Sequence, residues 1–314
     1  MRFLLFIFAV FHFKLSALTP PLLLDFDSLV LGSRTWEKTG PLFDDFYFYK
    51  ALFEKNGLLF IDPPHQQCKI PKVLHFIWVG PNPYPEKSVQ KMLSWKKHHQ
   101  DWTIKFWTDS IHQPCPIEGI EKHLVSEFEW DYFGKFYNRT SNYGEKSDLL
   151  RYEILWREGG LYIDHDIFCF RSFEDFHRTY DFFCFLDAPH INPGIWLLFF
   201  PNNGLIGSIP RHPILIETIE NVLKRWDQAE KTFPGHDRIA EGSRVFYRTF
   251  HSFILGVRKW IDHPDYINTI FPPACCYSRI LLRYEPSIQF CEHSFDCSWL
   301  KDNPLPTRKN KEKH

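Results

Sequence analysis

Two aspartates, Asp164 and Asp166, follow a short apolar stretch and are separated by a single residue, His165. Alternate residues of a strand share a face, so we expect the two carboxylates to point one way and His165 to point the other way. Crowded carboxylates repel each other unless a cation neutralises them, and Mg²⁺ and Mn²⁺ prefer such oxygen ligands together with substrate phosphates. The pair therefore predicts a divalent-metal site, with an acidic surface turn as the alternative.

The segment before this pair has the pattern of a helix, a sharp stop and a strand. Ser147 is the predicted N-cap, and Asp148 then stands in the first turn, where the helix dipole favours an anion. Asp148 and Arg151 are three residues apart, which makes their side chains neighbours on one helix face. The pair Gly159-Gly160 ends the helix, because glycine readily adopts the left-handed conformation of a C-terminal cap. The helix is thus expected to hold Asp148 and Arg151 beside the strand that leads to the acidic pair.

This block resembles the DXD-containing, sugar-binding region of glycosyltransferase family 32. The family pattern is Ser-Asp-x-x-Arg followed by Gly-Gly-x-Tyr-x-Asp-x-Asp, and the chain carries each element in register between Ser147 and Asp166. More distantly, the block is similar to the glucosyltransferase domain of the large clostridial toxins. The resemblance extends upstream to Ile70 and downstream to Trp299, so it covers most of the chain.

The first strand expected in this domain covers residues 70–80, a nearly continuous apolar run bounded by proline and glycine. It matches a family segment of the form Ile-Pro-Lys-x-x-His-x-x-Trp-x-Gly. Resemblance to the toxin domains implies that Trp78 stacks on the nucleotide base, since an indole offers a flat face to any base. The alternative is that Trp78 is a core aromatic residue, the usual position of a tryptophan in an apolar strand.

A βαβ unit begins with this strand. A helix is expected over residues 88–99 and a second strand over 101–109, and short loops between such elements predict a parallel sheet. With the resemblance, the expected fold class is α/β: a GT-A-like, Rossmann-type, mostly parallel sheet flanked by helices. The nucleotide-sugar site is expected at the C-terminal ends of the strands, where open α/β sheets bind ligands. An amphipathic helix over residues 214–226 is expected to be scaffold. Residues 227–260 are expected to hold another helix, and acceptor contacts are expected near Gly235 or Gly242.

A segment that begins at Asn202-Asn203 resembles a family segment that lies ahead of a His-Pro pair. It is expected to form a strand and a turn near the sugar. Asn203 or Asn202 is a candidate to hydrogen-bond a sugar hydroxyl. The alternative for both is a turn-forming asparagine.

The segment that ends at Trp299 resembles the terminal loop of the family, which closes over the diphosphate and can add a metal ligand. The resemblance makes His293 the third candidate metal ligand, and it makes Ser298 and Trp299 candidate diphosphate contacts. Asp296 or Glu292 is an alternative to His293, because the spacing of the loop departs from the family patterns. A solvated C-terminal loop is the remaining alternative.

The chemistry implied by the resemblance is transfer of a hexose from a nucleotide-diphosphate sugar, with retention of anomeric configuration. Negative charge grows on the departing diphosphate as the C–O bond breaks through an oxocarbenium-like state. Mn²⁺ or Mg²⁺ on Asp164 and Asp166 would neutralise that charge, and Arg151 would add a fixed positive charge. Asp148 is expected to hold ribose or sugar hydroxyls, and Tyr162 is expected to line the donor pocket.

No residue stands out in the sequence as a covalent nucleophile, so a front-face substitution assisted by the leaving diphosphate is the expected route. The motifs define neither the sugar nor the acceptor, which is a glycan, a lipid or a protein. Two other functions fit the same motifs. One is a nucleotide-sugar hydrolase that transfers to water, and the other is a non-catalytic protein that binds glycans or nucleotides.

Composition supports a folded chain with a large core. The 314 residues are 44% hydrophobic and 18% aromatic, which argues against disorder, and a formal net charge of −1 gives no electrostatic case for binding nucleic acid. The predicted organisation is a signal peptide or N-terminal anchor over 1–19, a helical extension over 20–66, the glycosyltransferase-like domain over 67–300 and a basic tail over 301–314.

The N-terminus has the features of a targeting segment. Met1-Arg2 precede an apolar run over residues 3–13, which is too short to span a bilayer and is typical of a secretory signal peptide. This pattern favours export over a cytoplasmic location. The alternatives are an uncleaved anchor, which would associate the chain with a membrane, and a buried N-terminal helix.

The chain has eight cysteines, an even number that is compatible with an oxidising compartment. Cys275-Cys276 and Cys291 with Cys297 are candidates for one or two disulfides. No two cysteines have the Cys-x-x-Cys spacing, which argues against a structural zinc site.

Overall fold

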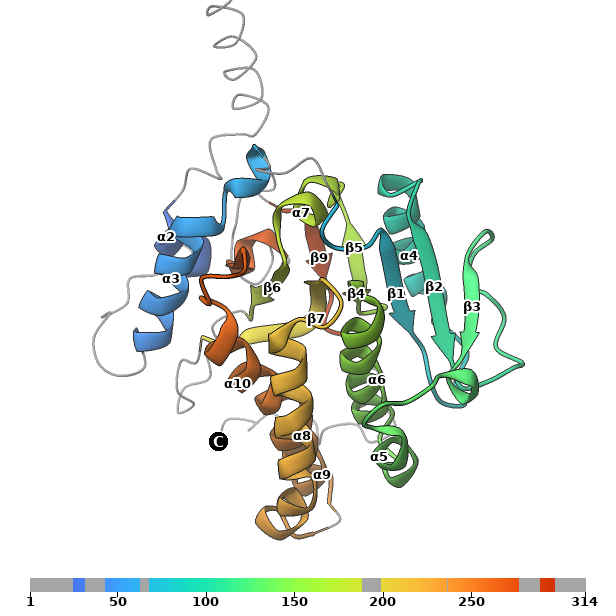
Figure 1. Cartoon of the computed structure of the whole chain (residues 1–314). Helices are drawn as coiled ribbons and strands as arrows, with labels where there is room; N and C mark the ends of the chain where they lie inside the picture. Colours follow the sequence, from blue (N-terminus) through green and yellow to red (C-terminus); the bar gives the residue numbers. More distant parts are fainter. Residues whose placement is uncertain are drawn as a thin grey trace, which may run out of the picture.

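The computed structural model describes residues 25–31, 43–62, 68–187, 199–235, 237–276 and 289–296 (Figure 1). Its α-helices are α2 (Phe26–Leu31), α3 (Asp44–Asn56), α4 (Glu86–His98), α5 (Gly134–Arg139), α6 (Tyr143–Glu158), α7 (Glu174–Thr179), α8 (Pro213–Thr232), α9 (Arg238–Val245) and α10 (His251–Trp260). Its strands are β1 (Val73–Ile77), β2 (Thr103–Thr108), β3 (Glu121–Leu124), β4 (Gly160–Ile163), β5 (Ile167–Cys169), β6 (Phe182–Leu186), β7 (Pro201–Ser208), β8 (Asn268–Phe271) and β9 (Cys291–His293). The short helical turns are η3 (Leu59–Ile61), η4 (Val125–Glu127), the π-helical η5 (Phe246–Phe250) and η6 (Pro273–Cys275).

Seven of the described strands form one sheet, in the order β3-β2-β1-β4-β7-β6-β8. β1 runs parallel to β2 and β4, β3 runs parallel to β2, and β8 runs parallel to β6. β7 runs antiparallel to both of its neighbours, and β5 and β9 form a separate antiparallel pair. The predicted fold class is confirmed: a Rossmann-type α/β arrangement whose central sheet is mostly parallel and flanked by helices.

The first βαβ unit is present as predicted, with shorter strands. β1 ends at Ile77, α4 covers the predicted helix, and β2 begins at Thr103. The strand β3 was not predicted. It lies at the edge of the sheet and reads Glu-Lys-His-Leu, so it lacks the apolar pattern that marks buried strands.

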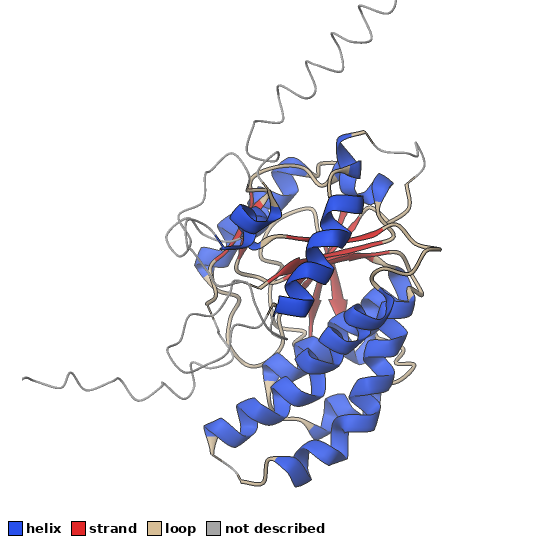
Figure 2. Cartoon of the chain, turned by 90° about the vertical axis from the view of Figure 1, so that its left-hand side faces the viewer, coloured by secondary structure: helices blue, strands red, loops and turns tan. Residues whose placement is uncertain are grey.

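Helices cover the sheet and extend from it (Figures 1 and 2). α4 packs against β5, α3 packs against β8, and α8 packs against α10 and α6. The core beneath α7 is built from aromatic side chains in contact, such as Phe176 with Phe271 and Phe173 with Phe183. Aromatic residues, which the composition shows to be abundant, therefore build this part of the core.

Several predicted features lie outside the described residues. They are the N-terminal targeting segment, the basic tail, and the domain boundaries near residues 19, 66 and 300, all of which stay predictions. Within the part of the chain that the structure describes, no helix combines the length and the apolar character needed to cross a bilayer.

Candidate active site

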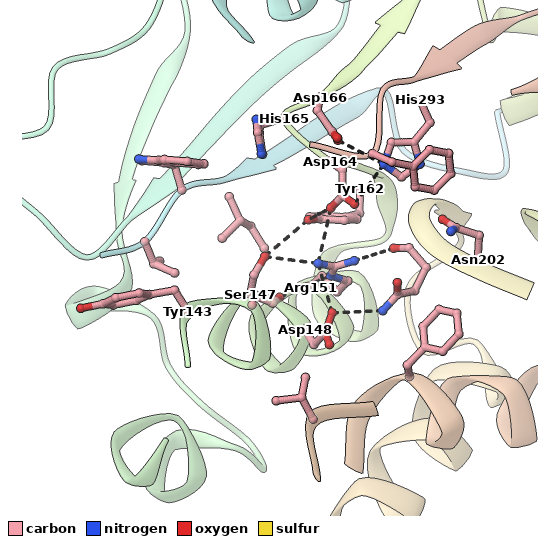
Figure 3. A pocket seen from close by; sticks show the side chains of 18 of the residues that line it. Tyr143, Ser147, Asp148, Arg151, Tyr162, Asp164, His165, Asp166, Asn202 and His293 are labelled. Atoms are coloured by element: carbon pink, nitrogen blue, oxygen red, sulfur yellow. Dashed lines mark hydrogen bonds and ion pairs between the residues drawn. The ribbon is translucent and has the colours of Figure 1, made fainter. Parts of the chain in front are cut away.

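A pocket opens at the carboxyl ends of β1 and β4. The strands β2 and β4 flank β1, so the connections leave β1 toward opposite sides of the sheet, and such a switch point leaves a crevice in open α/β sheets. Trp78 follows β1 and Asp164 follows β4, and both line the pocket. Its volume of about 440 Å³ is in the range of small-molecule sites (Figure 3).

The helix that enters the pocket is α6, and it begins earlier than predicted. Asn142 is the N-cap, since its side chain accepts a hydrogen bond from the Glu145 backbone N–H. Ser147 therefore lies in the second turn, and the prediction that it caps the helix was wrong. Gly159 ends the helix with φ of 66°, as predicted from the glycine pair.

Asp148 and Arg151 form a buried network with Asn203. Arg151 Nη2 lies 3.1 Å from Asp148 Oδ1, and Arg151 Nη1 donates to the Asn203 carbonyl oxygen at 2.7 Å. The amide of Asn203 donates to Asp148 Oδ1 at 3.0 Å, and Thr249 Oγ1 donates to Asp148 Oδ2. Burial raises the pKa of Asp148, against the charge of Arg151 and these hydrogen bonds. Both carboxylate oxygens of Asp148 thus have partners within the protein.

Arg151 also connects this network to the acidic pair. Its Nη2 atom lies 3.4 Å from Asp164 Oδ1, and its guanidinium lies 4.2 Å from the centroid of the Tyr162 ring. The Tyr162 hydroxyl donates to the same oxygen of Asp164 at 2.5 Å. The positive charge of Arg151 is therefore held next to the carboxylate that leads the DXD motif.

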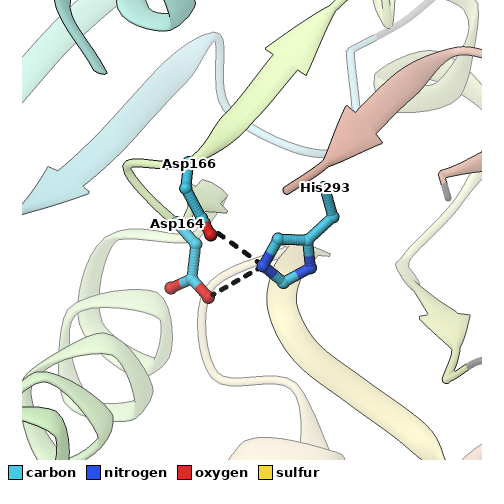
Figure 4. A group of neighbouring side chains, drawn as sticks. All are labelled: Asp164, Asp166 and His293. Carbon is cyan, nitrogen blue, oxygen red and sulfur yellow. Dashed lines mark ion pairs between the residues drawn. The ribbon is translucent and has the colours of Figure 1, made fainter. Parts of the chain in front are cut away.

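Asp164, Asp166 and His293 come together in the pocket (Figure 4). His293 Nε2 lies 3.2 Å from Asp166 Oδ1 and 3.8 Å from Asp164 Oδ2, and one ligand atom from each residue lies within 4.8 Å of the other two. Two carboxylate oxygens and one imidazole nitrogen at this spacing fit a divalent cation. The three residues predicted as metal ligands are thus neighbours, although His293 comes from the distant strand β9.

The two aspartates share a side for a reason that differs from the prediction. β4 ends at Ile163, and a tight turn at His165 and Asp166 leads into β5, so a turn rather than a continued strand places the carboxylates together. His165 points the other way, as predicted, and its Nδ1 lies 2.8 Å from Ser88 Oγ on α4.

Electrostatics couple His293 to Asp166. Burial opposes charge on the imidazole, but the hydrogen bond and negative charge of Asp166 outweigh burial and raise the pKa of His293 to about 9. Burial alone would raise the pKa of Asp166, but the hydrogen bond and the charge of His293 outweigh burial and lower this pKa below its usual range. The pair therefore holds a proton where a cation would bind.

The two alternatives to His293 do not join the acidic pair. Asp296 donates its backbone N–H to Asp166 Oδ2 at 2.7 Å, while its carboxylate lies 2.5 Å from Lys87 Nζ. Glu292 is the middle residue of β9, so its side chain leaves the opposite face from that of His293. Ser298 and Trp299 lie outside the described residues.

Trp78 is half-buried at the rim of the pocket. Its indole N–H donates to the Asn82 carbonyl oxygen at 2.8 Å, and its ring meets the edge of His165 at a centroid distance of 4.9 Å. Gly80 N–H donates to the Asp109 carboxylate at 2.9 Å, which fixes the loop that follows Trp78. Trp78 is thus positioned by its neighbours and still faces the cavity.

The asparagines differ in their roles. Asn203 is committed to Asp148 and Tyr152 through its amide group. Asn202 lines the pocket, and its Oδ1 accepts from the Gly204 backbone N–H at 2.7 Å. Both asparagines line the pocket, and they differ in that the amide nitrogen of Asn203 already donates to Asp148 and Tyr152.

Part of the pocket wall lies at Gly242, one of the two glycines near which acceptor contacts were expected. α9 and η5 contribute Gly242, Val245, Phe246 and Phe250, which we call the apolar wall, and the end of β6 contributes Asp187. Phe246 is 45% exposed. The three apolar side chains beside Gly242 were not predicted.

Comparison with known proteins defines the class of this region. Residues 85–183 match the model described as "Glycosyltransferase sugar-binding region containing DXD motif". The chain thus carries the DXD-containing sugar-binding region of glycosyltransferases, and the resemblance to family 32 is confirmed for this region.

Two curated proteins are similar to part of the chain. Inositol phosphoceramide mannosyltransferase 3 of Schizosaccharomyces pombe is 27% identical over 201 residues, which is 62% of this chain and 49% of that protein. Subversion of eukaryotic traffic protein A of Legionella pneumophila is 32% identical over 143 residues, 40% of this chain and 21% of that protein. The chain therefore spans about half the length of the first relative and less of the second.

Two solved structures are also similar. The PaToxG glycosyltransferase has a TM-score of 0.47 and 18% identity, with 68% of this chain and 79% of that chain covered. The UDP-bound glycosyltransferase domain of the YGT toxin has a TM-score of 0.46 and 10% identity, with 65% and 80% covered.

Proposed function

We propose that this protein is a metal-dependent glycosyltransferase that moves a hexose from a nucleotide-diphosphate sugar to a hydroxyl acceptor. The observation that carries the proposal is the cluster of Asp164, Asp166 and His293 beside Arg151, in a pocket at the carboxyl ends of parallel strands. The match of residues 85–183 to a glycosyltransferase region supports it.

The donor site follows from the placement of these groups. Asp164, Asp166 and His293 would hold a divalent cation, which would supply Lewis-acid stabilisation of the diphosphate when bound. Arg151 adds a fixed charge that is buried and oriented by Asp148, so it needs no reorganisation as the leaving group becomes negative. We place the nucleotide base on Trp78, the sugar near Asn202 and Tyr162, and the diphosphate against the cation, with Ser298 and Trp299 as further contacts.

The donor set favours Mn²⁺ over Mg²⁺. Mg²⁺ takes oxygen ligands in a strict octahedron, whereas a set of two carboxylates and one imidazole is mixed. We propose Mn²⁺ as the physiological ion, with Mg²⁺ as a weaker substitute. Retention of anomeric configuration by front-face substitution stays a proposal that rests on the family resemblance.

For the acceptor we propose an amphiphilic lipid with a hydroxyl-bearing head group. Phe246 of the apolar wall lines the pocket and is partly exposed. On the same stretch of chain Ile239, one helical turn before Gly242, is 82% exposed. A hydrocarbon chain that covers this surface would remove apolar area from water, and this burial would stabilise the complex. The S. pombe relative is by its name a mannosyltransferase of inositol phosphoceramide, which supports this class of acceptor. We further propose that the chain is exported, on the pattern of its N-terminus.

The direct test is a donor panel. Purified full-length protein is incubated with nucleotide sugars with Mn²⁺, with Mg²⁺ and without metal, and nucleoside diphosphate, free sugar and glycoside are separated. We expect Mn²⁺-dependent glycoside formation with one donor. Release of free sugar alone would indicate a hydrolase, and donor binding without any product would indicate a binding protein.

The acceptor class is tested with inositol phosphate that either carries or lacks a long alkyl chain. We expect the alkylated acceptor to have the lower KM. Ile239→Ser and Phe246→Ser should raise that KM roughly tenfold and leave kcat unchanged. Ile111→Ser is the matched control, because Ile111 is 69% exposed and lies outside the pocket. Equal KM values for the two acceptors would exclude the lipid and leave a soluble glycan or a protein.

A further inference from the structure

Two cysteines lie at the base of the strand that carries His293. Cys276 directly follows η6, and Cys291 is the first residue of β9. Both side chains are buried, and their Sγ atoms are 2.9 Å apart. A disulfide joins its sulfur atoms at about 2.05 Å, so a bond needs an approach of less than about 1 Å.

We propose that Cys276 and Cys291 are oxidised to a disulfide that fixes β9, and with it the candidate metal ligand. Among the described residues, Cys169 on β5 also lies beside Cys291, because the two residues pair in register across β5 and β9. Its Sγ, however, donates to the Arg171 carbonyl oxygen at 3.0 Å and is thereby directed to another partner. The geometry thus favours a pairing, Cys276 with Cys291, that combines two of the cysteines named from the sequence, whereas Cys297 lies outside the described residues.

The proposed disulfide lies close to His293 and would restrain its position. The Cys276 carbonyl oxygen accepts a hydrogen bond from the His293 backbone N–H at 2.9 Å. Cys276 is therefore already in contact with His293, the candidate metal ligand. On its other side β9 pairs with β5, where His293 is in register with Ile167, the residue after Asp166. A covalent tie at Cys291 would therefore limit how far His293 can move away from Asp166. This consequence for the metal rests on the proposed function, whereas the disulfide itself does not.

The chemistry is thiol–disulfide exchange with a disulfide oxidant, such as oxidised glutathione or an oxidised protein dithiol. The two thiols lose two protons and two electrons as the S–S bond forms, and the oxidant disulfide takes these up as its own S–S bond breaks to give two thiols. Because both sulfurs are buried in the folded chain, the exchange is expected while the chain folds. Oxidising compartments supply such partners.

Peptide mapping tests the bond without any assay of activity. Full-length protein secreted from an oxidising compartment is alkylated under denaturing conditions, digested without reductant and analysed by mass spectrometry. We expect one linked pair of peptides that contains Cys276 and Cys291, which reductant separates. Alkylation of both cysteines as thiols, or a link from Cys291 to Cys169 or Cys297, would overturn the proposal.

Stability and metal binding give a second readout on the same protein. Reductant should lower the Tm of the wild type by about 5 °C and weaken Mn²⁺ binding, because the unfolded chain and β9 both gain freedom. Cys276→Ala and Cys291→Ala should each abolish the response to reductant. Cys184→Ala, which removes a buried thiol on β6, should keep it. Loss of the response in Cys184→Ala, or its persistence in Cys291→Ala, would contradict the assigned pair.

Discussion

Charged and hydrogen-bonded side chains form one wall of the pocket, and apolar side chains form another. The charged wall comes from α6 and the turn between β4 and β5, and Arg151 within it is only 6% exposed. The apolar wall comes from α9 and η5, and Phe246 within it is 45% exposed. The two walls therefore differ in chemistry and in how much surface they still offer to a ligand.

This difference suggests a division of labour. On the charged wall each group is already bound to another, as Arg151 is to Asp148 and Asn203, so the electrostatic environment is in place before a donor arrives. The side chains of the apolar wall pack on one another, as Phe246 does on Phe250 at a centroid distance of 5.3 Å, and contribute apolar area that a ligand can cover. We expect substitutions in the charged wall to change catalysis and folding, and substitutions in the apolar wall to change only which acceptor binds.

The largest effect is expected from Asp166→Asn. The change removes one metal ligand charge and the partner of His293, so kcat/KM for transfer should fall about 10³-fold or more. The measurement is Mn²⁺-dependent product formation at saturating acceptor. Asp262→Asn, which alters an exposed aspartate paired with Lys55, is the control and should retain activity. Unchanged Mn²⁺-dependent turnover in Asp166→Asn would remove the charged wall from catalysis.

Stability should separate the two walls next. Arg151→Met leaves Asp148 buried without its charge partner, so the free energy of unfolding should fall by about 3–5 kcal/mol. Phe246→Ser alters an exposed side chain and should change that free energy by less than about 0.5 kcal/mol. Urea unfolding followed by circular dichroism measures both. Similar decreases in the free energy of unfolding of the two variants would mean that the two walls contribute equally to stability.

Two glycines give a matched comparison within the pocket. A Cβ atom at Gly204 would lie 2.8 Å from Asp164 Oδ2 and 3.0 Å from His293 Cε1, so Gly204→Ala must displace two candidate metal ligands. We expect Mn²⁺ affinity to fall about 10- to 100-fold. A Cβ atom at Gly242, in the apolar wall, would meet nothing within 4 Å, so Gly242→Ala should leave Mn²⁺ affinity unchanged. Equal effects in calorimetric titrations would contradict the placement of the metal.

The pH dependence of metal binding gives a smaller, graded effect. His293 has a pKa of about 9 without metal, so below that pH a cation must displace its proton. Mn²⁺ affinity should therefore rise by up to about tenfold per pH unit between pH 6.5 and 8.5. In metal-free protein the ion pair with Asp166 stabilises the fold fully below pH 6.5, and this stabilisation is lost as pH rises through about 9. A flat affinity profile would argue against His293 as a ligand.

The charged wall could be predicted from the sequence because its residues are close along the chain. Asp148, Arg151, Asp164 and Asp166 occupy one helix–turn–strand unit, whose local pattern fixes their relative positions. The start of α6 was misplaced because Asn142 and Ser147 are both acceptable caps, and only the backbone geometry shows which of them is used.

The rest of the site depends on long-range packing that local patterns do not encode. The amide of Asn203 is bound to Asp148, and this contact, which the antiparallel pairing of β7 with β4 makes possible, was not predicted. Acceptor contacts were expected near Gly242, but Phe246 and Phe250 were not named, because they look like ordinary core residues until the π-helical turn of η5 places them at the pocket.

The central claim is that Asp164, Asp166 and His293 together hold one divalent cation. The most direct test is a Mn²⁺ titration of the full chain with nucleoside diphosphate present, followed by pulsed electron paramagnetic resonance of the bound ion. We expect one Mn²⁺ per chain, with a coupled nitrogen that disappears in His293→Ala and weaker binding in Asp164→Ala. Binding that shows no nitrogen coupling and is unchanged in both variants would contradict it.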